Sequence, residues 1–153
     1  IATPDHWHGR MTVDALAAGK DVYVERPMTR TAGEAVAVLD AWQRTGRVVT
    51  VGVQAMADPV WVRAFDLVRT GKIGHVAHAQ TGVFRNDARG QWRFYRLAPT
   101  MTPKTIDWDL FLGHRFELAG RPVGPKDVPF DRAAFAQWRC LSAFSGGPLT
   151  DLL

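Results

Sequence analysis

The sequence is poor in cysteine and in lysine, and it has no long apolar run. Its 153 residues include one cysteine, Cys140, which excludes an internal disulfide framework and a cysteine-based metal cluster. Trp138 and Leu141 lie close to Cys140, and they predict a buried, inert thiol rather than a nucleophile. No stretch of about 18 consecutive apolar residues is present, so no segment is predicted to cross a membrane.

Positive charge is carried mainly by arginine. Lysine and arginine total 19 against 15 acidic residues, and the lysines are only Lys20, Lys72, Lys104 and Lys126. The net charge of +4 favours anionic ligands such as a dinucleotide or an acidic sugar, and it does not by itself imply nucleic acid. The apolar share of 46% and the charged share of 22% are typical of an ordinary globular protein.

The first half of the chain predicts alternating helices and short apolar strands. Thr3 and Pro4 predict the start of a helix that ends at Gly19, and Thr31 with Glu34 forms a capping box for the next helix. Continuous apolar strands suit a parallel sheet that is covered on both faces, so we predict a doubly wound α/β fold. The expected elements are helices over residues 4–18, 31–45 and 58–70, and strands over residues 21–25 and 48–53.

The pattern changes after Gly74. Residues 75–84 alternate in a way that fits an antiparallel sheet with one face packed. The segment that follows is rich in loops, with one short helix expected near residues 107–112. We therefore predict two parts, residues 1–57 as the later half of a doubly wound domain and residues 58–153 as the start of an α+β domain with an open antiparallel sheet.

A loop over residues 84–96 interleaves arginines with aromatic residues. Our interpretation is a solvated loop whose aromatic side chains pack against the core. A loop that contacts substrate or another subunit is the alternative, and single-stranded nucleic acid is the least favoured reading. The residues are Phe84, Arg85, Arg89, Trp92, Arg93, Phe94, Tyr95 and Arg96.

Three motifs stand where a strand would give way to a helix or a loop. They are the segment from Thr3 to His8 (TPDHWH), the triplet from Glu25 to Pro27 (ERP) and the segment from Val51 to Gln54 (VGVQ). In open α/β sheets, ligands bind beyond the carboxyl ends of the strands, and helix starts offer free backbone N–H groups there. The three motifs are therefore expected to line one crevice.

These motifs also carry a resemblance to a known family. TPDHWH, AGKDVYVERP and VGVQ, followed by GKIG, IDWDLFLG, QWR and SGGPLTD, stand in the order found in the Gfo/Idh/MocA (glucose–fructose oxidoreductase / inositol dehydrogenase) family. The likeness covers almost the whole chain, and the ordered set is far more specific than any single motif. The chain resembles an internal fragment of such an oxidoreductase.

The resemblance implies a Rossmann domain followed by a substrate and oligomerisation domain. It implies NAD or NADP as cofactor and hydride transfer to or from a hydroxyl of a sugar, inositol or related polyol. It also implies a homo-oligomer, with no nucleic-acid or membrane partner and no metal, and the cytoplasm is the expected location, although some relatives in the subgroup are exported. It assigns catalytic roles to Arg26 and Asp151, and cofactor contacts to Thr3, Pro4, His6, His8, Glu25, Pro27 and Gln54.

Two departures from the family pattern matter. The family usually has lysine at the position of Arg26, and arginine stays charged at any working pH, so Arg26 is expected to orient a hydroxyl or stabilise negative charge rather than act as a general base. No G-x-G-x-x-G motif occurs in the sequence. We expect that motif before Ile1 and a histidine partner of Asp151 after Leu153, and we expect the 153-residue chain alone to be inactive.

Simpler roles exist for the same side chains. His6 and His8 suit a helix start at the surface better than a metal site, because no third ligand stands near them. Glu25 could be a solvated strand end, Gln54 could bind loop backbone, and Asp151 could be a helix cap. Two functional rivals also stay open: an NAD-dependent glycosidase on the same scaffold, and a cofactor-binding sensor or regulator that has lost catalysis.

Overall fold

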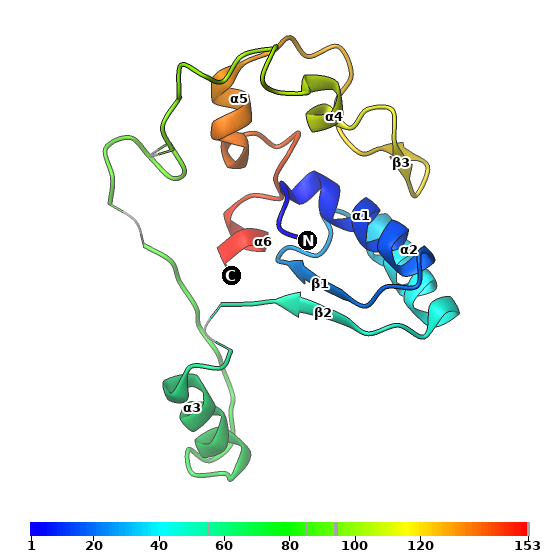
Figure 1. Ribbon diagram of the computed structural model, residues 1–153. Helices are drawn as coiled ribbons and strands as arrows, with labels where there is room; N and C mark the ends of the chain where they lie inside the picture. The colour runs from blue at the N-terminus through cyan, green and yellow to red at the C-terminus, as the bar shows by residue number, and fades with distance from the viewer. Residues whose placement is uncertain (55, 85, 94, 153) are drawn as a thin grey trace.

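The N-terminal part of the chain places two helices beside a short parallel sheet. The computed structural model describes residues 1–54, 56–84, 86–93 and 95–152. Arg85 and Phe94 of the predicted arginine and aromatic loop lie outside the described residues. The elements of this part are α1 (Asp5–Ala17), β1 (Val22–Glu25), α2 (Ala32–Thr45) and β2 (Val49–Gly52), shown in Figure 1. They confirm the predicted alternation.

One face of the sheet is buried. The strands pair in parallel, with Val22 opposite Val49 and Val24 opposite Val51. Val22 and Val24 pack with Leu16 of α1 and Ala41 of α2 in an apolar core. Apolar residues spaced at the 3.6-residue helix period give each helix one apolar face, and that face packs on the sheet. The prediction that both faces are covered was wrong for the described structure. Tyr23 on the opposite face is 61% exposed, because α1 and α2 both pack on the same side.

The predicted N-cap of α2 is confirmed, and the predicted N-cap of α1 is not. The Thr31 side chain accepts a hydrogen bond from the backbone N–H of Glu34, which confirms the cap of α2, and Gly46 ends that helix in the left-handed conformation. The predicted cap at Thr3 was wrong. Pro4 occupies the N-cap position of α1 with an extended backbone, and the helix begins at Asp5.

The chain leaves this unit after β2 and forms α3 (Pro59–Arg69), which is capped by Asp58. No residue of α3 is buried, and Figure 1 shows the helix apart from the other elements. Residues 75–84 then run on without strand structure, so the predicted antiparallel sheet is not seen in the described ranges. A strand needs a neighbour to accept its backbone hydrogen bonds, and no described segment supplies one.

The rest of the chain folds back over the N-terminal end of α1 (Figure 1). Phe144 and Leu112 are almost fully buried, with Trp108 and Phe111 packed beside them. Cys140 is exposed, so the predicted buried thiol was wrong: a short 3-10 turn holds it at the surface. The elements are α4 (Trp108–Leu112), the two-residue strands β3 (Glu117–Leu118) and β4 (Arg121–Pro122), α5 (Arg132–Ala136), η1 (Trp138–Cys140) and α6 (Pro148–Leu152).

Two arginines fasten the second part to the first. Arg30 donates from Nη1 to the carbonyl of Ala143 and from Nη2 to the carbonyl of Val123, both at 2.7 Å. Arg10 of α1 donates to the carbonyl of Glu117 at 2.8 Å. The division of the chain at residue 57 stays a prediction. Within the described ranges, no helix combines the length and the apolar character that a membrane span needs.

Gly113 offers a test of this packing. It ends α4 with φ of +71°, and an added Cβ would lie 2.8 Å from Cζ2 of Trp7. Gly120 has φ of +72° but open space around it. We expect Gly120→Ala to cost about 1 kcal/mol from backbone strain alone. Gly113→Ala should cost about 1–3 kcal/mol more because it also overpacks the Trp7 ring. Urea unfolding of the two variants measures the difference, and equal losses would contradict the packing.

Candidate functional site

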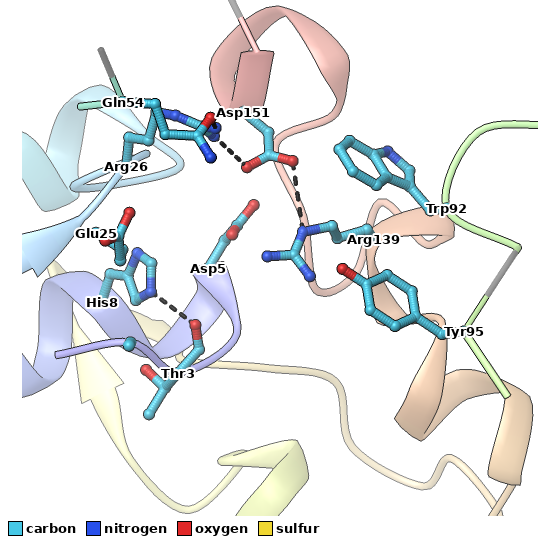
Figure 2. Close-up of a pocket in the computed structure, with 11 residues that line it drawn as sticks. Thr3, Asp5, His8, Glu25, Arg26, Gln54, Trp92, Tyr95, Arg139 and Asp151 are labelled. Carbon is cyan, nitrogen blue, oxygen red and sulfur yellow. Dashed lines mark hydrogen bonds and ion pairs between the residues drawn. The ribbon is translucent and has the colours of Figure 1, made fainter. Parts of the chain in front are cut away.

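A cavity of about 380 Å³ opens where the carboxyl ends of β1 and β2 meet the start of α1 and the last helix, α6. Figure 2 shows side chains from distant parts of the sequence converging on it. Its size is within the range of small-molecule sites. The lining residues are Ala2, Thr3, Asp5, His8, Glu25, Arg26, Gln54, Trp92, Tyr95, Arg139 and Asp151.

An ion pair joins the two predicted catalytic residues. Arg26 Nη1 donates to Asp151 Oδ1 at 2.7 Å across 125 positions of sequence. Arg26 Nη2 donates to Gln54 Oε1 at 2.6 Å, so the end of β1 and the loop after β2 are linked through one guanidinium. The Asp151 side chain is 4% exposed and that of Arg26 is 19% exposed. A charge-assisted pair with so little exposure fixes both side chains in one geometry.

Asp5 holds the segment that carries Asp151. Its Oδ2 atom accepts hydrogen bonds from the Ser145 hydroxyl at 3.0 Å and from the Gly146 backbone N–H at 3.2 Å. Burial raises the pKa of Asp5 above its ordinary value, and the two hydrogen bonds oppose that shift. The first residue of α1 therefore anchors the turn before α6. Asp151 lies inside α6, so it is not the helix cap that its place after two glycines suggested.

His8 is a structural tie within the pocket wall. Its Nδ1 lies 2.8 Å from the carbonyl oxygen of Pro27, and its Nε2 lies 2.7 Å from that of Thr3. Both partners are acceptors, so the ring donates through whichever nitrogen carries the N–H, and that depends on the tautomer. Both ring nitrogens face backbone carbonyl oxygens. His8 thus connects the N-terminal segment to the turn after β1.

Three of the predicted cofactor residues do not line the cavity. Pro4 is the N-cap of α1, and Pro27 is buried beneath His8 after a cis peptide bond with Arg26. His6 points to the other side of α1. Its Nε2 donates to the carbonyl of Phe111 at 2.7 Å, and its ring lies 5.0 Å from that of Phe144. The structure brings the remaining predicted residues together: Thr3, His8, Glu25, Arg26, Gln54 and Asp151.

Sequence reasoning missed five lining residues. Asp5 stands inside the TPDHWH motif, and Arg139 stands inside QWR, but neither was singled out. Trp92 and Tyr95 belong to the arginine and aromatic loop, where a contact with substrate was the second interpretation. Ala2 had no signal in the sequence. Among the described residues, no group of three or more His, Cys, Asp or Glu side chains could hold a metal ion.

Comparison with known proteins supports the fold of the N-terminal part. The sequence model of an oxidoreductase family with an NAD-binding Rossmann fold, Gfo/Idh/MocA, matches residues 1–53, which hold β1 and β2. The chain belongs to the Gfo/Idh/MocA oxidoreductase family. In open α/β sheets ligands bind beyond the carboxyl ends of the strands, and Glu25 is the last residue of β1.

Individual relatives differ in their names. The chain is 34% identical over 74 residues to the scyllo-inositol 2-dehydrogenase (NAD(+)) of Bacillus subtilis, and the aligned segment covers 48% of this chain and 22% of that protein. It is 31% identical over 137 residues to the inositol 2-dehydrogenase of Leifsonia xyli, which covers 86% and 38%. It is 26% identical over 104 residues to an alpha-N-acetylgalactosaminidase of Shewanella oneidensis, which covers 62% and 23%. The chain thus spans between 22% and 38% of the length of these relatives.

His6 should make the protein less stable in mild acid. Burial lowers its pKa from 6.5 to about 4, so between these values the unfolded chain binds a proton that the folded chain does not. Stability is therefore lost as pH falls from 6.5 towards 4, by on the order of 2–3 kcal/mol. His6→Phe should flatten this slope, although it also loses the bond to Phe111. Urea unfolding of both proteins from pH 4 to pH 7 measures it, and parallel curves would contradict the assignment.

Asp5 should matter for stability through its two hydrogen bonds. Asp5→Ala leaves the Ser145 hydroxyl and the Gly146 N–H without their acceptor, and we expect a loss of about 1–3 kcal/mol. Asp5→Asn keeps an acceptor oxygen of similar shape and serves as the matched control, with a smaller loss. The free energy of unfolding in urea measures both. An Asp5→Ala protein as stable as the unchanged one would show that the tie is not needed.

Proposed function

We propose that the chain forms part of an oxidoreductase that transfers a hydride between NAD(P) and a hydroxyl-bearing carbon of a sugar, inositol or related polyol. The observation that carries the proposal is the Arg26–Asp151 ion pair at 2.7 Å, set in the cavity at the ends of the two parallel strands. A hydroxyl in this cavity would meet a permanent cation beside a buried carboxylate.

The pocket residues suit one end of a dinucleotide. Glu25 ends β1 and Gln54 follows β2, and carboxylate and amide oxygens accept hydrogen bonds from ribose hydroxyls. The sequence has no G-x-G-x-x-G motif, so these residues would hold the nicotinamide ribose rather than the pyrophosphate. When bound, NAD(P) supplies the two-electron acceptor for the hydride.

The side chains of this chain then have separate tasks. Arg26 donates to the oxygen of the reacting hydroxyl and stabilises its negative charge as the proton leaves. Asp151 positions Arg26 and supports the base that accepts the proton, which is the histidine partner implied by the family resemblance. Arg26 is a poor base, and both ring nitrogens of His8 face backbone carbonyl oxygens. The substrate carbinol becomes a carbonyl as its carbon loses the hydride and its oxygen loses the proton.

Arg26 tests this proposal. In the protein expressed from its complete coding sequence, Arg26→Met should lower kcat/KM for polyol oxidation by about 100-fold, because one charged donor to the developing oxyanion is removed. Asp151 keeps Arg139 as a partner, so its burial is not left uncompensated. NADH formation on a panel of sugars and polyols is the measurement. Arg26→Lys should retain more activity than Arg26→Met, since the ammonium still donates.

The exposed Arg47, which does not line the cavity, supplies the matched control as Arg47→Met. Its kcat/KM should be unchanged. An Arg26→Met enzyme with full activity would remove Arg26 from the reaction. Cleavage of a glycoside without net NADH formation, together with no oxidation of free polyols, would replace the proposal by the glycosidase that the Shewanella relative is named for.

A further inference from the structure

The wall of the cavity opposite the strand ends has a different composition. Arg139, Trp92 and Tyr95 line it, and all three come from beyond the part of the chain that the NAD-binding fold covers. Figure 2 shows Arg139 directed into the cavity between the two aromatic rings, with Asp5, Glu25 and His8 on the side that it faces. This wall is therefore placed to meet the substrate rather than the cofactor.

Aromatic rings surround the Arg139 guanidinium. Its central carbon lies 4.2 Å from the ring centre of Trp138, 5.5 Å from that of Trp92 and 5.9 Å from that of Tyr95. Rings attract a guanidinium through its faces, whereas its five N–H groups lie in its plane. The rings therefore hold the group in one orientation and leave its donor edge for another molecule.

The hydrogen bonds of the two pocket arginines differ. Arg26 uses Nη1 on Asp151 and Nη2 on Gln54, at 2.7 and 2.6 Å. Arg139 approaches Asp151 through Nε alone, at 3.4 Å, which is longer than a normal charge-assisted bond. Within the described ranges, the Nη atoms of Arg139 have no hydrogen-bond acceptor from the protein. Two donors of a positioned cation are therefore available at the cavity.

The charges at this wall centre on Asp151. Two guanidiniums share its carboxylate, and Arg139 is the more distant of the two. Two further carboxylates line the same cavity. Asp5 is buried and bound by Ser145 and Gly146, and Glu25 lies on the opposite wall. The two in-plane donors of Arg139 match a carboxylate, which accepts two parallel N–H bonds, and the acidic side chains nearby disfavour the second charge of a phosphate dianion.

We infer that Arg139 binds a carboxylate of the substrate, so that the pocket selects an acidic sugar, an aldonate or a uronate, over its neutral counterpart. Trp92 and Tyr95 border the same space and offer apolar surface to the C–H groups of the sugar. This inference deepens the proposed function and rests on it, because it names the class of polyol that the site accepts.

The test compares matched pairs of probes that differ only in the carboxylate: D-glucuronate with D-glucose, D-galacturonate with D-galactose, and D-gluconate with sorbitol. Titration calorimetry is done on the protein expressed from its complete coding sequence, with NADH present. In at least one pair the acid should bind 10-fold tighter or more, since a hydrogen bond to a charged group contributes about 1.5–3 kcal/mol. Equal affinities in every pair would overturn the inference, as would tighter binding of D-glucose 6-phosphate than of any acid.

Arg139→Gln should lower the affinity for the acid by roughly 10- to 100-fold and leave that for the neutral sugar within about twofold. The exposed Arg96 is near in sequence but does not line the cavity, so Arg96→Gln is the matched control for a lost charge. If Arg139→Gln does not fold, as judged by NADH binding, Arg139→Lys takes its place and should show a smaller loss. An acid preference that survives in the folded variant would overturn the role of Arg139.

Hydride transfer is measured separately from binding. Tight binding of an acid without NADH formation from any probe would reject the proposed oxidoreductase activity and leave the carboxylate site standing. NADH formation from neutral polyols, with no preference for acids in binding, would support the oxidoreductase activity and reject the carboxylate site. The two ideas can therefore fail independently.

Discussion

The buried carboxylate of Asp5 is the interaction on which the site depends. It accepts hydrogen bonds from Ser145 and Gly146 and so holds the turn before α6 against the first residue of α1. Because that turn is anchored, Asp151 reaches Arg26 from 125 positions away. Burial raises the pKa of Asp5, and the two hydrogen bonds that its carboxylate accepts offset part of the cost of burying it.

A second constraint is the sharing of Asp151 between two arginines. Each of its carboxylate oxygens faces one guanidinium, and the pair to Arg26 is the closer. Arginine at position 26 gives up the possibility of proton transfer and provides a fixed cation instead. The cavity therefore has three regions (Figure 2). Glu25 lies on one wall, at the end of β1, and the aromatic residues around Arg139 form the opposite wall. The Arg26–Asp151 ion pair lies between the two walls.

Local sequence chemistry predicted the elements of the first 70 residues well. The Thr31 cap and the stop at Gly46 depend on neighbours a few residues away, so the sequence suffices to find them. Residues 75–84 have the alternation of a strand but no strand structure, because pairing requires a partner segment that alternation cannot supply. Cys140 was misread for a similar reason, since apolar neighbours in sequence do not decide which side of a turn is buried.

By itself, the sequence determined the helices and strands of the β1–β2 unit, and its resemblance to one family predicted roles for Arg26 and Asp151. Motifs and caps are local, and the ordered set of motifs is specific to one family. Only the tertiary structure decided which face of α1 meets the cavity. In that structure His8 lies against the carbonyl oxygens of Thr3 and Pro27, and His6 donates to the carbonyl of Phe111. The tertiary structure also brought Arg139, Trp92 and Tyr95 to the site, because contacts between distant segments depend on how the whole chain folds back, which no local pattern records.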